Sequence, residues 1–237
     1  MPKNTKTLAQ LRTLIRQRAD MEDSNFVTDD EIVGFINQSI AELHDELVTL
    51  YEDFYVTKGA DITLPAGNPT TLPDDFYKCL GVDLNTSGIK YRLKPFQFGE
   101  RNAYNSPVYQ TTGVPNLFYS IRGNELTFIP DSTVSGTANI WYVPQPQQFA
   151  LGSGDDAVEL NAKARQIAIG YEEYIILDGA MKCLIKEESD VSTLAALKEQ
   201  QRQRIVKSAA RRDAGEPYRV QDVRSGTLQT NYVNWMG

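Results

Sequence analysis

The stretch RGNELTFIPDSTVSGTANIWYVPQP, residues 122–146, decides the fold, because it predicts a compact β unit between two regions of helical sequence. The triplet Arg122-Gly123-Asn124 predicts a tight turn, since Gly and Asn tolerate positive φ, and strand-like runs flank it. A second turn over residues 131–136 leads into a strand that carries Trp141 and Tyr142. The stretch has no obvious catalytic residue, which raises the question of why a helical chain contains a small sheet.

Outward from this stretch, Pro and Gly interrupt the whole of residues 58–146, and the apolar runs between them have the length of strands. Short strands joined by turns predict an antiparallel barrel or sandwich, and we place this β domain at residues 57–150. The candidate strands are residues 62–64, 77–84, 89–93, 116–121, 125–129 and 137–143.

Helices are predicted before the β domain, in residues 1–56. Apolar residues at helical spacing indicate a first helix over residues 8–18. The sequence Thr28-Asp29-Asp30-Glu31 then matches a capping box, in which the Thr hydroxyl and the Glu carboxylate each accept a hydrogen bond from a backbone N–H at the start of a helix. The apolar positions that follow keep a helical period to about residue 51.

Helical sequence returns after the β domain, in residues 151–213. One helix is predicted from about residue 160 to about residue 187, and a last helix follows a cap at Ser189-Asp190 and runs to about residue 212. The helices on the two sides of the β domain need one another to bury their apolar faces. We therefore expect an α+β protein, an antiparallel four-helix bundle with the β domain inserted into it.

Composition excludes several classes of protein. The 237 residues are 41% hydrophobic and 23% charged, an ordinary globular mixture. No run of about 18 apolar residues is present, so we expect no contact with a membrane, and the N-terminus lacks the apolar segment of a secretory signal. Cys79 and Cys183 stand alone without a CxxC motif, which favours reduced thiols; a disulfide between them is the alternative.

Charge is unevenly distributed along the chain. The net charge is −7, with eleven acids and no Lys or Arg in residues 20–53, whereas residues 198–212 contain six bases and one acid. Such a split favours complementary surfaces, either within one subunit or between neighbours. Sequence-independent DNA binding requires a basic excess, so the charge disfavours that function.

The sequence contains little that indicates a catalytic site or a metal site. His44 is the only histidine, which removes most Ser-His and Cys-His schemes and every multi-histidine metal site. Glu42 and Glu46 share one helix face, from which Asp45 is turned away, so we interpret this group around His44 as a solvated helix face. Residues 152–156, GSGDD, lack the Lys of a P-loop and the ligands of an EF-hand, and we expect a flexible connector there. We expect no enzyme, no cofactor and no metal.

The C-terminal tail, residues 214–237, is polar and without periodicity but carries aromatic residues. One interpretation is a disordered end. The other is an arm that docks on a partner through aromatic anchors and arginines, and we favour it because disordered segments rarely contain Trp beside other aromatics. The candidate binding residues in and just before the tail are Arg211, Arg212, Tyr218, Arg219, Val220, Arg224, Tyr232 and Trp235.

Three pieces of the predicted β domain, LPDDFYKCLGVDL (residues 72–84), GNELTFIPD (123–131) and IWYVPQP (140–146), resemble the β domain of tailed-phage head-to-tail adaptor proteins. The helical segment TDDEIVGFINQSIAELHDELVTLYEDF also resembles theirs. The tail tubular protein A type of short-tailed phages is the most similar in character, and the resemblance covers about residues 5–212.

This resemblance implies a structural virion protein without enzymatic activity, made in the bacterial host cytoplasm and located in the virion neck. It implies a ring of typically twelve copies, with helical bundles around a channel and the β domain facing outwards or towards the tail. The implied partners are other copies of the chain, the portal protein, and tail nozzle or tail fibre proteins. Double-stranded DNA would pass through the channel without specific binding. C-terminal segments of relatives reach into clefts between portal subunits, which would make the candidate residues of the C-terminal tail a portal-binding set.

Two questions stay open from the sequence. The chain could be another phage tail component, such as a baseplate or fibre-attachment subunit, which would bind no portal. Within a ring, Glu42, Asp45 and Glu46 could line the channel and repel passing DNA, or they could pair with the basic residues 198–212 of the same or the next subunit.

Overall fold

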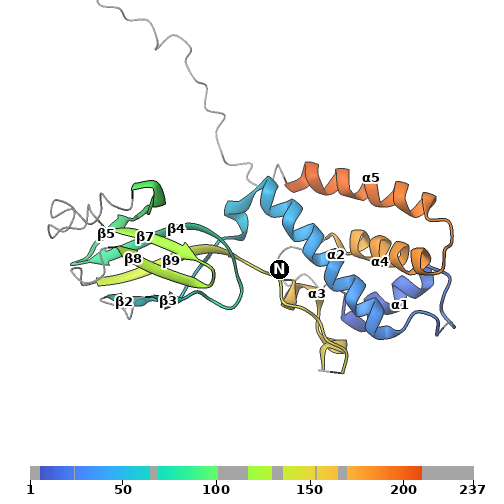
Figure 1. The fold of residues 1–237 in the computed structure, drawn as a ribbon. Coiled ribbons are helices and arrows are strands. Elements are labelled where there is room, and N and C mark those ends of the chain that lie inside the picture. Colours follow the sequence, from blue (N-terminus) through green and yellow to red (C-terminus); the bar gives the residue numbers. More distant parts are fainter. Residues whose placement is uncertain are drawn as a thin grey trace, which may run out of the picture.

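The computed structural model describes residues 6–23, 25–64, 69–100, 117–129, 136–152, 154–164 and 170–209. They form a helical part and a β part, which lie at opposite ends of an elongated molecule (Figure 1). Each part has its own hydrophobic core. The predicted α+β class is therefore confirmed.

The helical part gathers segments from both ends of the described chain around one core. The N-terminal helices each begin at a capping box, formed by Thr7 with Gln10 and by Thr28 with Glu31, the second of which the sequence predicts. The helices are α1 (Leu8–Arg18), α2 (Asp29–Leu50), the one-turn α3 (Leu160–Lys163), α4 (Glu172–Lys186) and α5 (Ser192–Ala209). Among the described residues, no helix is both long and apolar enough to cross a membrane.

One prediction for the second helical segment is wrong. The single helix expected over residues 160–187 is not continuous, because α3 ends at Lys163 and, directly before α4, Gly170 has φ +83° and Tyr171 has a non-helical φ of −120°. The described residues therefore contain five helices where a bundle of four was expected. The predicted cap of the last helix is present, since Asp190 accepts a hydrogen bond from the Ser192 N–H at 3.0 Å. The expected end of that helix, near residue 212, lies outside the described residues.

The β part consists of two sheets that share one core. The first has the order β1 (Thr57–Lys58), β9 (Gly136–Pro144), β4 (Phe76–Thr86), β5 (Ile89–Arg92), with β2 (Ile62–Leu64) also paired to β9. The second has the order β3 (Thr70–Thr71), β8 (Glu125–Ile129), β7 (Phe118–Arg122), β6 (Lys94–Pro95). Among the described strands, all pairs are antiparallel except β6 with β7.

The barrel alternative is wrong for the described strands, because the edge strands of the two sheets do not pair with one another to close a barrel. The core forms instead between the sheets, where Val82 and Ile140 of the first meet Leu126 and Phe128 of the second. The predicted strands agree with β2, β4, β5, β8 and β9 to within two residues, and β7 begins two residues later than expected. The turn at Gly123 has φ +58°, as predicted, whereas most of the turn over residues 131–136 lies outside the described residues.

Candidate functional site

The acidic and basic segments of the sequence meet in an ionic network between α2, α4 and α5. Its centre is Asp178 of α4, whose side chain is only 4% exposed. The Ser39 hydroxyl donates to this carboxylate at 2.5 Å, and the ammonium groups of Lys182 and Lys198 lie 2.8 and 2.6 Å from it. Burial alone would raise the pKa of Asp178, but the hydrogen bonds from Lys182, Lys198 and Ser39 outweigh it and hold this pKa below its usual value.

Two of the three acids proposed for a channel or a subunit interface belong to the same network. Glu42 lies 3.0 Å from Lys182 and 3.6 Å from Lys198, and Glu46 lies 2.8 Å from Arg202. These contacts are within one chain, as in the second of the two interpretations of the charge split. A role for either carboxylate in a channel or between subunits stays a prediction.

Asp45, the third of these acids, contacts Tyr77 rather than the bases that pair with Glu42 and Glu46. Its side chain is 63% exposed and faces the β part. A hydrogen bond between Asp45 and Tyr77, together with partial burial, raises the pKa of the Tyr77 hydroxyl.

Of the acids around His44, for which a solvated helix face was predicted, Glu42 and Asp45 have side chains that are 49% and 63% exposed, whereas His44 itself is buried. His44 is 1% exposed, and its Nε2 lies 3.1 Å from the carbonyl oxygen of Pro144, at the end of β9. Its ring meets the edge of Tyr77 at a centroid distance of 4.8 Å. Burial lowers the pKa of His44, although Asp45 and the Pro144 carbonyl oppose this shift. The sequence contained the signal, because His44 follows the buried Ile40 by four residues and so falls on the same helix face.

A pocket of about 220 Å³ opens beside His44, where α2 meets the chain that leaves β9. The Asn37 amide fixes this chain by donating to the Phe149 carbonyl and accepting from the Phe149 N–H, both at 2.9 Å. The pocket is lined by α2, by Tyr77 of β4 and by residues 145–148, so its residues join the two parts of the molecule. Within the described ranges, no cluster of three His, Cys, Asp or Glu side chains could hold a metal ion.

A flexible connector was expected over the GSGDD stretch, but two of its residues, Asp155 and Asp156, make specific contacts with other segments. Asp155 is buried, accepts from the Ala150 N–H at 2.8 Å and pairs with Lys163 at 2.5 Å. Asp156 pairs with Arg12 of α1 at 2.8 Å. The connector thus ties the chain leaving the β part to α1 and α3.

Cys79 and Cys183 are free thiols, as favoured from the sequence, and burial raises the pKa of Cys183 to about 11. The candidate portal-binding residues lie outside the described residues, namely Arg211, Arg212, Tyr218, Arg219, Val220, Arg224, Tyr232 and Trp235.

A protein-family model described as SU10 adaptor protein matches residues 6–224. The chain belongs to the SU10 adaptor protein family. The match covers both the helical part and the β part and supports a phage structural adaptor, and hence a component of the virion without an enzymatic role. It agrees with the resemblance to phage adaptors but does not extend to the tail tubular protein A type. No curated protein matches the chain.

Proposed function

We propose that this member of the SU10 adaptor family forms a ring of about twelve copies that joins the portal vertex to the tail and leaves a channel for DNA, as tail tubular protein A-like connectors do. The main support for this proposal is the match of residues 6–224 to the SU10 adaptor protein family model. It supports a virion adaptor, and an adaptor that joins two structures would contact more than one partner.

The architecture supports this proposal. A ring between two different structures needs contacts between its own copies and two further faces for the structures on either side. The helical part and the β part lie at opposite ends of the long axis and offer two such faces (Figure 1). The C-terminal residues 214–237 follow the helical part in sequence and would supply the portal contact, and the β part would meet a tail nozzle or tail fibre protein.

The proposal is tested by weighing the cognate portal ring with and without an excess of the full chain, using mass photometry. Twelve copies of 26.6 kDa add about 320 kDa. We expect this gain with the full chain and its loss when residues 214–237 are deleted, while the circular dichroism of the shortened chain stays unchanged. No gain with the full chain would overturn the portal role and favour a baseplate or fibre-attachment subunit.

A further inference from the structure

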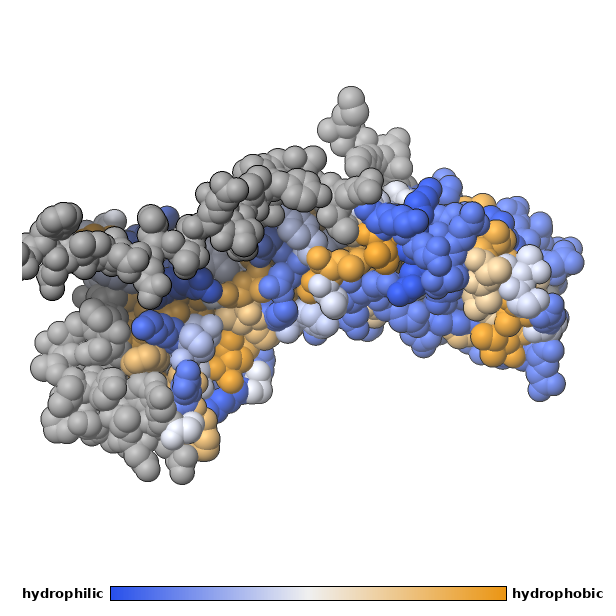
Figure 2. Space-filling view, turned by 90° about the horizontal axis from the view of Figure 1, so that it is seen from above, coloured by the Kyte–Doolittle hydropathy of each residue, from blue (hydrophilic) through white to orange (hydrophobic). Residues whose placement is uncertain are grey.

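An exposed apolar surface lies where the helical part joins the β part. It contains Leu50 at the end of α2, Phe54 of η1 (Glu52–Tyr55), Val56 before β1, and Trp141 of β9, a set that we call the junction stripe. These side chains are between 37% and 42% exposed. Figure 2 shows hydrophobic surface in this region, between the two parts of the molecule.

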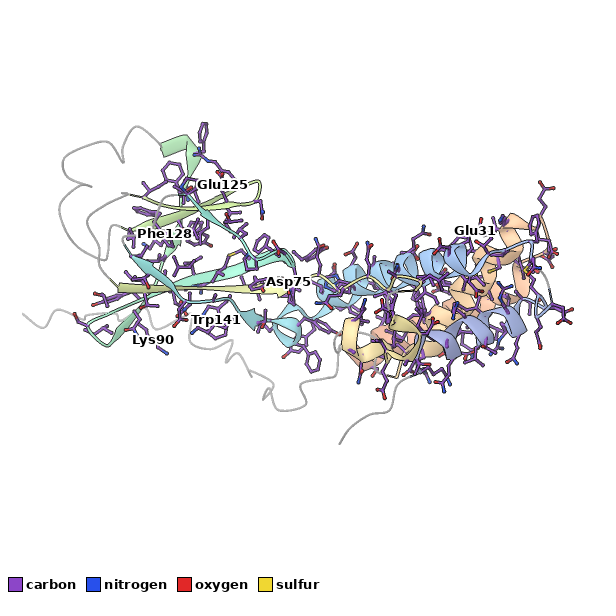
Figure 3. All side chains as sticks on the ribbon, turned by 90° about the horizontal axis from the view of Figure 1, so that it is seen from below. Glu31, Asp75, Lys90, Glu125, Phe128 and Trp141 are labelled. Carbon is purple, nitrogen blue, oxygen red and sulfur yellow. The ribbon has the colours of Figure 1, made fainter. Side chains whose placement is uncertain are left out.

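Strand register places the β members of the junction stripe on one face. Lys58 is opposite Trp141 and Thr57 is opposite the buried Tyr142, so Trp141 and Val56 lie on the outer face of the first sheet, away from the core. Figure 3 shows this arrangement, with Phe128 between the sheets and Trp141 on the far side of the first sheet. An ion pair between Lys78 and Glu52 fixes η1, and with it Phe54, beside the same sheet.

The polar groups around Trp141 are already satisfied. The indole N–H donates to Asp83 at 2.7 Å, and Asp61 accepts from Asn139 at 2.5 Å and pairs with Lys58 at 2.7 Å. A partner that covers the ring of Trp141 therefore leaves no buried donor there without an acceptor. Partly exposed Trp in such surroundings is typical of the residues that contribute most to a protein interface.

We propose that the junction stripe is a lateral contact between neighbouring copies of this chain, an inference that rests on the proposed ring. In an elongated subunit whose two ends meet different partners, the flank midway between the ends is the surface that faces the next copy, and the junction stripe lies there. Its exposed apolar area is roughly 300 Å², taking full side-chain areas of about 150–250 Å². This is well below the roughly 800 Å² per partner of a stable complex, so isolated copies associate weakly and closure of the ring reinforces the contact.

The test is sedimentation velocity of the full chain up to about 500 µM, a range chosen for the weak association expected of so small a surface. We expect concentration-dependent self-association that Phe54→Ser weakens by at least about tenfold. Ile89→Ser is the matched control, because Ile89 is 55% exposed but lies at the β4–β5 turn, outside the junction stripe, and should have little effect. Circular dichroism verifies that both variants fold. A chain that stays monomeric throughout, or equal behaviour of the two variants, overturns the inference.

Weighing the portal ring with each variant separates this inference from the proposed function. If the wild-type chain adds mass but Phe54→Ser adds as much as Ile89→Ser, the lateral contact is elsewhere and the portal role stands. If the wild-type chain adds no mass yet self-associates through Phe54, the portal role falls and the contact stands.

Discussion

Replacing Asp178 by Asn tests whether the ionic network holds α5 on the rest of the helical part. Removing one partner of a buried ion pair costs about 3–5 kcal/mol, because the other charge loses its counter-charge. Here Asn still accepts the hydrogen bond from Ser39, and Lys182 and Lys198 keep Glu42 as a partner and are 19% and 22% exposed. We therefore expect the free energy of unfolding to fall by about 2–3 kcal/mol.

Urea unfolding followed by circular dichroism at 222 nm measures this loss, since the helical part dominates that signal. With a dependence of about 2 kcal/mol per M urea, the midpoint should fall by about 1–1.5 M. The control is Glu199→Gln, which removes an acid that is 52% exposed and pairs with Arg202 on the same helix, and it should cost less than about 0.5 kcal/mol. If Asp178→Asn changes stability no more than this control does, the network is not what stabilises α5.

The difference in the free energy of unfolding between wild type and Asp178→Asn should also depend on pH, which provides a second check. The pKa of Asp178 is lower in the folded than in the unfolded chain, so its contribution is complete above the unfolded value and disappears as the pH falls through the folded value. The gap between wild type and Asp178→Asn should thus be constant from pH 7 to about pH 5 and shrink below about pH 4.

Three further predictions concern single buried positions. A methyl group at Gly179 of α4 would lie 2.6 Å from Ile15 Cδ1 of α1, so Gly179→Ala should lower the free energy of unfolding by about 1–2 kcal/mol. The control Gly34→Ala meets no atom of the described residues within 4 Å and should raise the free energy of unfolding by up to about 1 kcal/mol. Equal effects of the two substitutions in urea unfolding would contradict the close approach of α1 and α4. Burial lowers the pKa of His44, so the unfolded chain binds this proton more readily and stability should fall as the pH drops below about 6.5. His44→Gln should make the free energy of unfolding less dependent on pH in this range. Parallel curves of this free energy against pH for wild type and His44→Gln would refute the prediction. Burial raises the pKa of Cys183 to about 11, so carboxymethylation of this thiol at pH 8 should be at least about tenfold slower in the folded than in the urea-unfolded chain. Peptide mass spectrometry measures the two rates, and equal rates would mean that the thiol is accessible in the folded chain.

Features that depend on neighbouring residues could be predicted from the sequence. The capping box at Thr28 and the helical period behind it fix the start and the buried face of α2, because these interactions span only three or four residues. The turn at Gly123 is predictable for the same reason, since its backbone conformation favours Gly.

Features that depend on distant segments could not be predicted. The end of α3 at Lys163 and the positive φ of Gly170 before α4 could not be predicted, because apolar residues at helical spacing continue through this region of the sequence. The helical period places His44 on the buried face of α2, but its hydrogen-bond partner, the carbonyl of Pro144 at the end of β9, lies a hundred residues later and could not be predicted. Likewise, the charge split indicated complementary surfaces, but only the fold shows that Glu42 and Glu46 meet bases of their own chain.

Because Glu42 and Glu46 pair with bases of their own chain, Asp45 is the acid whose substitution can distinguish a channel-lining role from a role between subunits. Reversing Glu42 or Glu46 would set a Lys beside Lys182 or Arg202, so that failed assembly would follow from damage to the helical part alone. Asp45 has a side chain that is 63% exposed and lies outside the network on Asp178, so Asp45→Lys leaves α4 and α5 in place.

Two measurements on Asp45→Lys then distinguish the two roles. If Asp45 lines the channel, the variant fills the portal ring as the wild type does, but the ring retains double-stranded DNA at low salt, because a Lys at each copy attracts phosphates. If Asp45 lies between subunits, the ring does not fill, although the isolated variant keeps the circular dichroism of the wild type. A variant that fills the ring and retains no DNA excludes both roles and leaves Asp45 with its contact to Tyr77 at the junction of the two parts.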